Sequence, residues 1–422
     1  MSLQGTFNTA VQAMNAQSQA LSNISTNIAN TNTTAYKASD THFQTLLNHT
    51  QPVDKSFFTV NTFDYRQVDK QGTISTTNRS LDLAINGRGF LVTNTQADGS
   101  GVWQYTRDGA LFGKATTLDV DTDGNGANDQ GTRLTTADGS YIYGWAAHDD
   151  GMFNQVNDLK ALVPVTYSTD SIFPSKATNL ITLRANISAA NEGRQNVSLP
   201  FVDQEGNSRS LSVGFTSNQD GNWTLDMAAN DTNNQPVQVT FDPPNLSFNG
   251  TGNLVTPADG LLNVTVSDVN GPQSFTLEVK NVTQFADNGA LTVNNVDQDG
   301  YIQGRLQKVY FNDSGVLIGS YTNGEVKNLF KLPVATFAAD GNLEAKPGNI
   351  FVQTSEAGAM QLNGLGQPQG TTQIVAGALE QSNVDLADQF SKMIVTQRAY
   401  SSAAKVLTTA DEMTQAARDL KR

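Results

Sequence analysis

The two ends of this chain carry an apolar side chain at every seventh position, and this repeat constrains the fold more than any other feature. At the N-terminus the repeat consists of Phe7, Met14, Leu21 and Ile28, with Leu3 and Ile24 beside them. Near the C-terminus it consists of Leu379, Leu386, Met393, Tyr400 and Leu407, with Phe390 beside them. Such a repeat is typical of helices that pack lengthwise against one another. We therefore predict that both ends are helical, that they meet in one coiled-coil domain, and that these side chains form the assembly surface.

The limits of the two helices follow from local signals. We predict a helix over residues 1–30 and a second over residues 383–420, where Ser382 and Asp385 are spaced as a capping box with Ser382 as N-cap. The first charged side chain of the chain is Lys37, so the N-terminal helix has no ion pairs along its length. Because such a helix is marginal in water, we expect it to be ordered only against partners. An ordinary core helix is the alternative.

The middle of the chain has the two-residue period of β-strands. Apolar residues alternate at Ile181/Leu183/Ala185/Ile187, Leu211/Val213/Phe215 and Phe275/Leu277/Val279. Nine Asp-Gly and seven Asn-Gly pairs punctuate the sequence, and Asn86-Gly87, between two apolar runs, predicts a hairpin. We predict a mainly antiparallel β middle whose length implies two stacked domains.

Together these patterns predict an α+β protein in which each domain is inserted into the sequence of the one before it. Residues 1–35 and 375–422 would form the helical domain, and residues 36–71 and 359–374 extended connectors. Residues 72–146 and 285–358 would form one β-domain, and residues 147–284 an inserted outer β-domain.

The amino-acid composition of the chain limits the classes of molecule that it can bind. The chain has 26 basic and 40 acidic side chains, a net charge of −14, which disfavours nucleic acid and anionic membranes. It contains no cysteine, which excludes disulfides and cysteine-bound metals. No apolar run approaches about 18 residues, so we expect no transmembrane helix. The first residues lack the basic segment of a secretory signal, so we expect export without a cleaved signal peptide.

The sequence contains few patterns that indicate catalysis or metal binding. His42, His49 and His148 show no metal-ligand spacing, and nucleophile and phosphate-loop motifs are absent, so we predict no catalytic residue and no cofactor. One acidic segment resembles a calcium loop, with oxygen ligands at Asp121, Asp123, Asn125 and Asp129. Because its twelfth position is Thr132 instead of glutamate, an acidic hairpin loop is the favoured alternative.

Several stretches resemble the bacterial flagellar rod and hook protein family. Residues 25–37 (STNIANTNTTAYK) are similar to its N-terminal motif, although Ala35 stands where glycine is expected. Similarity to its β-core continues at residues 81–90 (LDLAINGRGF), 105–109 (YTRDG), 299–306 (DGYIQGRL) and 319–324 (GSYTNG). Residues 377–386 (GALEQSNVDL) and 393–400 (MIVTQRAY) resemble its C-terminal helix. The insertion at 147–284 is typical of hook members.

The resemblance implies a structural subunit that polymerises into a curved, flexible tube, a universal joint that transmits torque from rod to filament. The terminal helices would line its inner wall. The implied partners are other copies of the chain, the distal rod, the hook cap, the hook–filament junction proteins and the type III export apparatus. The implied location is extracellular, in the flagellar hook.

Three alternatives stay open at this point. A distal rod protein would lack the insertion. A secreted, calcium-binding β-rich adhesin would use the acidic loop. A secreted glycosidase would need a pair of catalytic carboxylates, and no distinctive pair is present.

Overall fold

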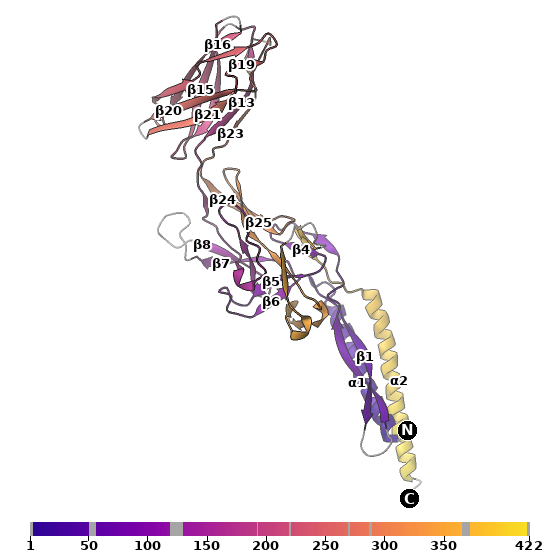
Figure 1. The fold of residues 1–422 in the computed structure, drawn as a ribbon. Helices are drawn as coiled ribbons and strands as arrows, with labels where there is room; N and C mark the ends of the chain where they lie inside the picture. Colours follow the sequence, from indigo (N-terminus) through magenta and orange to yellow (C-terminus); the bar gives the residue numbers. More distant parts are fainter. Residues whose placement is uncertain are drawn as a thin grey trace. The chain divides into compact units, whose positions relative to one another are not determined.

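The fold was obtained as a computed structural model, which describes residues 3–49, 56–118, 130–191, 193–218, 221–268, 271–286, 289–364 and 372–419. Within these ranges there are two long helices, α1 (Leu3–Ala29) and α2 (Leu386–Asp419), and mostly antiparallel strands between them (Figure 1). The predicted α+β class is confirmed. The chain divides into two compact units: unit 1 (Met1–Thr169, Lys308–Gly319 and Val326–Arg422) and unit 2 (Asp170–Gln307 and Ser320–Glu325).

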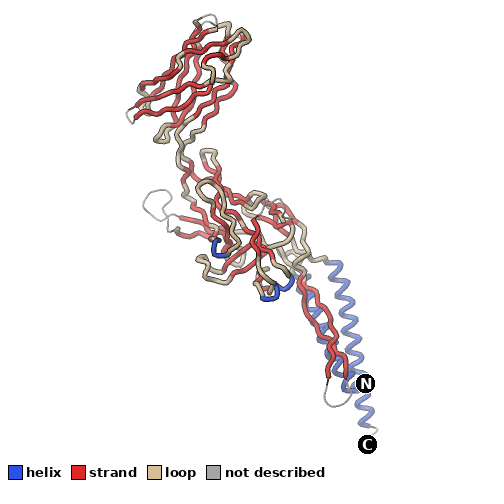
Figure 2. The backbone as a smooth tube through the Cα atoms, in the orientation of Figure 1, coloured by secondary structure: helices blue, strands red, loops and turns tan. Residues whose placement is uncertain are grey.

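The two helices lie side by side in unit 1 and run antiparallel, so that both chain ends lie at the same end of the pair (Figure 2). Helix α1 also packs against a hairpin of β1 (Ser39–His49) and β2 (Ser56–Arg66). The prediction of an extended connector over residues 36–71 is therefore wrong. The hairpin face near α1 is polar, since Asn23 donates hydrogen bonds to Thr41 and Asp64, and a polar face shows no apolar alternation in the sequence.

The remainder of unit 1 is a β-core. Its buried centre includes Phe90, Tyr105, Trp145 and Phe351. Its strands are β3 (Ile74–Thr76), β4 (Leu83–Asn86), β5 (Phe90–Asn94), β6 (Trp103–Thr106), β7 (Phe112–Thr117), β8 (Gln130–Thr135), β9 (Tyr141–Ala146), β10 (Val163–Pro164), β11 (Thr166–Ser168), β26 (Val326–Lys331), β27 (Pro333–Thr336), β28 (Glu344–Lys346), β29 (Ile350–Val352), β30 (Gln361–Gly364), β31 (Gln373–Ala376) and β32 (Ala378–Glu380). Short 3₁₀ turns occur at Leu159–Ala161, Asp340–Asn342 and Ser355–Ala357.

The predicted hairpin at Asn86-Gly87 does not form. Strand β4 pairs with β31, whereas β5 pairs with β6, β9 and β27. The chain turns a corner between two sheets here, with Gly87 and Gly89 both at positive φ. A side chain at Gly89 would lie 2.3 Å from Val334, so close packing against β27 requires glycine.

Unit 2 is an all-β body with its own core. Its main sheet has the order β14-β15-β16-β17-β20-β21-β13-β22, antiparallel except where β13 pairs with β21 and β22. The three alternating runs predicted from sequence are confirmed as strands with buried apolar faces, for example Leu183, Val213 and Leu277. The strands are β12 (Ile172–Phe173), β13 (Leu180–Ser188), β14 (Gln195–Val202), β15 (Ser208–Ser217), β16 (Asn222–Asn230), β17 (Pro236–Asp242), β18 (Asn245–Phe248), β19 (Leu254–Thr256), β20 (Leu261–Asp268), β21 (Gly271–Glu278), β22 (Thr283–Phe285) and β23 (Thr292–Gln298).

The boundary of the inserted part differs from the predicted range of 147–284. Residues 147–169 belong to unit 1, and residues 285–307 belong to unit 2. Two further strands, β24 (Gly304–Phe311) and β25 (Val316–Tyr321), contain residues of both units. Sequence pattern could not locate this boundary, because the strand period and the turn residues are the same on both sides of it.

Candidate functional site

The N-cap of helix α2 lies three residues later than the predicted cap, Ser382. Asp385 is the N-cap, because its Oδ1 accepts hydrogen bonds from the backbone N–H of Ala387 at 2.9 Å and of Asp388 at 3.3 Å. Ser382 instead accepts from the N–H of Val384 in the preceding turn. The predicted helix member Leu379 lies in β32, which pairs with β3. Serine and aspartate are equally good N-caps, so the sequence could not decide between Ser382 and Asp385. The pairing of β32 with β3 keeps the preceding residues out of the helix.

The structure separates the predicted assembly side chains into three groups. Ile24 is buried; Met14, Leu21, Ile28, Leu379, Met393 and Leu407 are half-buried; Phe7, Leu386, Phe390 and Tyr400 are exposed. Leu3 is the first residue of α1. The apolar repeat of α2 is therefore only partly covered within the subunit, with Met393 and Leu407 half-buried and Leu386 and Tyr400 exposed.

Helix α2 presents three kinds of surface. The buried face contains Gln389, Thr396 and Ala410. At about 100° per residue, Leu386 and Phe390 lie on one flank of this face, and Val395, Val406 and Met413 lie on the other, while Ile394 lies further round, next to Lys405. All six apolar side chains are exposed, Phe390 by 51% and Val395 by 68%. Between the flanks, opposite α1, lie Ser391, Arg398, Ser402 and Lys405, which are polar and exposed.

Small side chains are buried on both helices: Ala10, Ala16 and Ala20 on α1, and Thr396 and Ala410 on α2. At the end nearest the β-core, Asn27 Nδ2 donates a 3.0 Å hydrogen bond to Gln389 Oε1, and these two side chains are 0% and 3% exposed.

Asn27 is also tied to the chain that follows α1. Its Oδ1 accepts from the Tyr36 hydroxyl and from the backbone N–H of Ser39, while its Nδ2 also donates to the Ser39 carbonyl. All four hydrogen-bonding positions of the amide are thus used, which satisfies a fully buried polar group.

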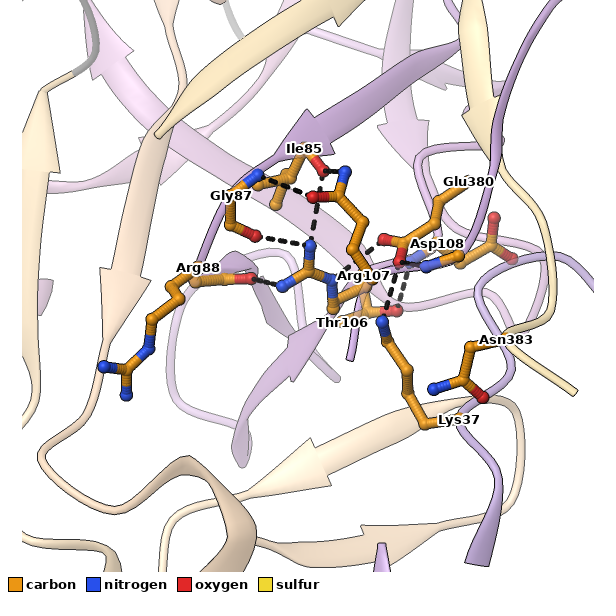
Figure 3. Close-up of polar contacts among 12 residues, drawn as sticks. Lys37, Ile85, Gly87, Arg88, Thr106, Arg107, Asp108, Glu380 and Asn383 are labelled. Carbon is orange, nitrogen blue, oxygen red and sulfur yellow. Dashed lines mark hydrogen bonds and ion pairs between the residues drawn. The ribbon is translucent and has the colours of Figure 1, made fainter. Parts of the chain in front are cut away.

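A buried ion cluster lies where the helices meet the β-core (Figure 3). Glu380 Oε1 accepts from Lys37 Nζ at 2.7 Å and from the N–H of Gly72 at 2.8 Å, and its Oε2 accepts from Arg107 Nε at 2.9 Å. The side chains of Lys37 and Glu380 are 0% exposed, and that of Arg107 is 3% exposed. One carboxylate therefore joins three segments that are distant in sequence.

Arg107 also organises the corner between β4 and β5. Its Nη1 donates to the Gly89 carbonyl at 3.1 Å, and its Nη2 donates to the carbonyls of Gly87 at 2.7 Å and Ile85 at 3.3 Å. With the bond to Glu380, the guanidinium is surrounded by acceptors, which is the condition for burying it. The glycine pattern of residues 86–89 thus serves a buried arginine and not a phosphate.

The titration of the cluster follows from its composition of two cations and one anion. Burial alone would raise the pKa of Glu380, but Arg107 and Lys37 outweigh burial, so that this pKa lies below its usual value. Burial and the nearby Arg107 lower the pKa of Lys37, and Glu380 compensates only in part. Sequence reasoning did not single out this cluster, because apolar periodicity cannot detect buried charges, although all three residues lie in the family-like motifs.

Asn383 completes the junction. Its Oδ1 accepts from the N–H of Ala38 at 2.7 Å, and its Nδ2 donates to the carbonyls of Gln67 and Lys70, both at 3.0 Å. The segment that leads into α2 is thus bonded to the segment that leaves α1 and to the segment that leaves the hairpin.

No metal or membrane site emerges from the described parts of the chain. The calcium-loop residues Asp121, Asp123, Asn125 and Asp129 lie outside the described residues. Elsewhere in the described ranges, no group of three histidine or acidic side chains is placed to hold a metal ion. Neither described helix combines the length and apolar character that crossing a bilayer requires.

Three family models, all of flagellar basal body proteins, match parts of the chain. "Flagella basal body rod protein" matches residues 7–37, and "Flagellar basal body rod FlgEFG protein C-terminal" matches residues 375–420. "Flagellar basal body protein FlaE D2 domain" matches residues 169–301, which corresponds closely to unit 2.

Full-length relatives then identify the particular family. The flagellar hook protein FlgE of Brucella suis is 30% identical over 100% of both chains, and that of Escherichia coli K12 is 29% identical over 96% of this chain and 98% of its own. A crystal structure of Helicobacter pylori FlgE2 covers 73% of this chain and 100% of its own, with a TM-score of 0.46 and 12% identity. The chain belongs to the flagellar hook protein family, and it is a structural subunit of the hook.

Proposed function

We propose that α1 and α2 form the inner layer of a tubular homopolymer and that α2 makes its main contacts between subunits. The observation that carries this proposal is the pair of apolar flanks on α2, which α1 leaves uncovered on both sides. Within its own subunit α2 contacts α1 and, through the ion pair of Lys392 with Asp40, strand β1. A helix that is covered along one face and has an apolar surface on each flank is suited to a ring or helical array of identical neighbours.

The position of the polar and apolar surfaces around α2 supports its placement in the inner wall of the tube. The face of α2 opposite α1 is mainly polar, with Ser391, Arg398, Ser402 and Lys405 exposed and Ile394 at its edge. If both apolar flanks contact neighbouring subunits, this polar face remains for the water-filled channel of the tube. Each large apolar side chain buried in this way contributes about 1.5–3 kcal/mol, before the costs of association.

We propose further that the tube works as a universal joint between rod and filament, with unit 2 on its outer surface. Unit 2 has 15 acidic and 6 basic side chains, which leaves a net charge of −9. Like-charged neighbouring units disfavour a tight apolar interface, so that contacts among them can change as the tube bends.

The remaining partners follow from membership of the family. We propose contacts with the distal rod at one end, the hook cap during growth and the junction proteins at the filament end. The chain would reach the extracellular hook through the type III export apparatus as an unfolded chain. The lack of cysteine suits this route, since no disulfide can form before passage through a narrow channel.

Seeded polymerisation tests the role of α2. Purified monomer is mixed with short, sheared fragments of wild-type hook, and growth is followed by sedimentation and negative-stain electron microscopy. Phe390→Asp should abolish elongation, because it places a charge on an apolar contact, while the exposed position leaves the monomer folded by circular dichroism. Ser391→Asp, one residue away on the polar face, should elongate like the wild type.

The two variants decide the question together. Elongation by Phe390→Asp at the wild-type rate would refute the role of this flank. Loss of elongation in both variants would show that α2 tolerates no charge anywhere, and would remove the distinction between its faces.

A further inference from the structure

Three chain segments connect the helices and hairpin of unit 1 to its β-core. Residues 36–38 follow α1, residues 67–73 follow the hairpin, and residues 378–385 precede α2. Any torque passed between the inner helices and the β-core of one subunit must cross these segments. The side-chain contacts among them therefore decide whether the connection is a hinge or a rigid joint.

Each of the three segments is bonded to the other two by buried side chains. Glu380 joins Lys37 of the first segment to Gly72 of the second. Asn383 joins Ala38 of the first segment to the carbonyls of Gln67 and Lys70 in the second.

The β-core is bonded to the same group. Arg107 reaches Glu380 from the β-core side, and Asn349 Nδ2 donates a 2.8 Å hydrogen bond to the Thr34 carbonyl just after α1. The β-core also packs closely against the hairpin, since a side chain at Gly341 would lie 2.7 Å from the ring of Tyr65.

We propose that Glu380, with Lys37 and Arg107, is the positioning group of a rigid joint that fixes the helices of a subunit at one angle to its β-core. Rotation at this point would draw the carboxylate away from at least one of the two cations. A buried charge without its partner is strongly unfavourable, because the interior screens it poorly and offers no water in exchange. Three directional contacts to one carboxylate oppose rotation about more than one axis.

The consequence for the hook rests on the proposed function. If the joint is rigid, bending of the tube is taken up by contacts between subunits and by unit 2, while the inner helices and the β-core of each subunit turn together. The simpler alternative is that the cluster contributes to stability alone and has no effect on the angle.

A distance measurement on the monomer distinguishes these two roles without requiring polymerisation. Because the chain has no cysteine, Ser391→Cys on α2 and Ser100→Cys on the β-core can carry two spin labels in an otherwise unlabelled protein. Double electron–electron resonance then reports the distribution of distances between them. We expect a narrow, single distribution in the otherwise wild-type chain and a clearly broadened one after Glu380→Gln.

Two further variants keep the test decisive. Leu134→Ala, a cavity in the β-core away from the joint, is the control for lost stability and should keep the narrow distribution. Lys37→Met leaves Glu380 and Arg107 as a neutral pair, so it should fold readily and give intermediate broadening. Equal, narrow distributions in Glu380→Gln and Lys37→Met would overturn the proposal, as would equal broadening in Leu134→Ala. Failure of the wild type to polymerise would bear on the proposed function alone.

Discussion

The carboxylate of Glu380 lies 2.7 Å from the ammonium of Lys37, and neither side chain has any exposed surface. Arg107 approaches the same carboxylate from the other side at 2.9 Å. This arrangement connects the two chain ends to the β-core, and it makes the stability of the helical part depend on residues more than 340 positions apart.

Removing the anion should cost more than removing one cation. Glu380→Ala leaves two buried cations without an anionic partner, and we expect the free energy of unfolding to fall by about 3–5 kcal/mol. Lys37→Met should cost clearly less, because Glu380 and Arg107 remain as a neutral pair. Urea unfolding followed by circular dichroism measures both losses. A larger loss for Lys37→Met would contradict this account of the charge balance.

The cluster should also make the protein sensitive to acid. The pKa of Glu380 in the folded chain lies below its unfolded value of about 4.3, so its contribution to stability is present above that value and is lost as the pH falls towards the folded pKa. We expect the stability advantage of the wild type over Glu380→Gln to be constant between about pH 6 and 8 and to shrink below about pH 4. Unfolding curves at a series of pH values measure this difference, and an advantage unchanged at pH 3 would argue against it.

Ala35 occupies a position where the backbone favours glycine. Its φ is +56°, its side chain is buried, and its N–H donates a 2.8 Å hydrogen bond to the Glu380 carbonyl. The turn expected from the glycine-containing family motif is thus kept, at a cost of about 1–2 kcal/mol in backbone strain. We expect Ala35→Val to lower stability by about 2 kcal/mol or more, because a β-branched side chain fits this conformation poorly. Ala35→Gly is the matched control and should remain within about 1 kcal/mol of the wild type, since relief of strain offsets the lost methyl group.

Unit 2 should lose stability independently of unit 1. Leu277 is fully buried in the core of unit 2, and Leu277→Ala should cost about 2–5 kcal/mol there. Hydrogen exchange read by mass spectrometry should show faster exchange in peptides from residues 180–298, with residues 83–118 unchanged. Faster exchange in both ranges would mean that the two units unfold as one.

Local sequence patterns correctly predicted the helical ends and many of the strands. The helical ends follow from a seven-residue repeat, and the strands of unit 2 follow from alternation such as that of Ile181, Leu183 and Ile187. These signals are reliable because a helix or strand with one buried face records its period directly in the order of its residues. The family motifs at the two ends likewise indicated the flagellar rod and hook family.

Other features depend on contacts between distant residues, and local pattern could not decide them. The Asn86-Gly87 corner has the sequence of a hairpin, yet Arg107 and β31 determine that β4 and β5 do not pair. The apolar repeat of α2 likewise could not show which of its side chains are covered within the subunit, where Met393 and Leu407 are half-buried and Leu386 is exposed.

The sequence by itself thus determined the type and period of each element and the family of the chain. Only the tertiary structure decided which partner each element has and where Lys37, Arg107 and Glu380 meet. The physical reason is that local propensity and periodicity are properties of neighbouring residues, whereas the energy of a buried charge depends on partners that only the folded chain brings within hydrogen-bonding distance.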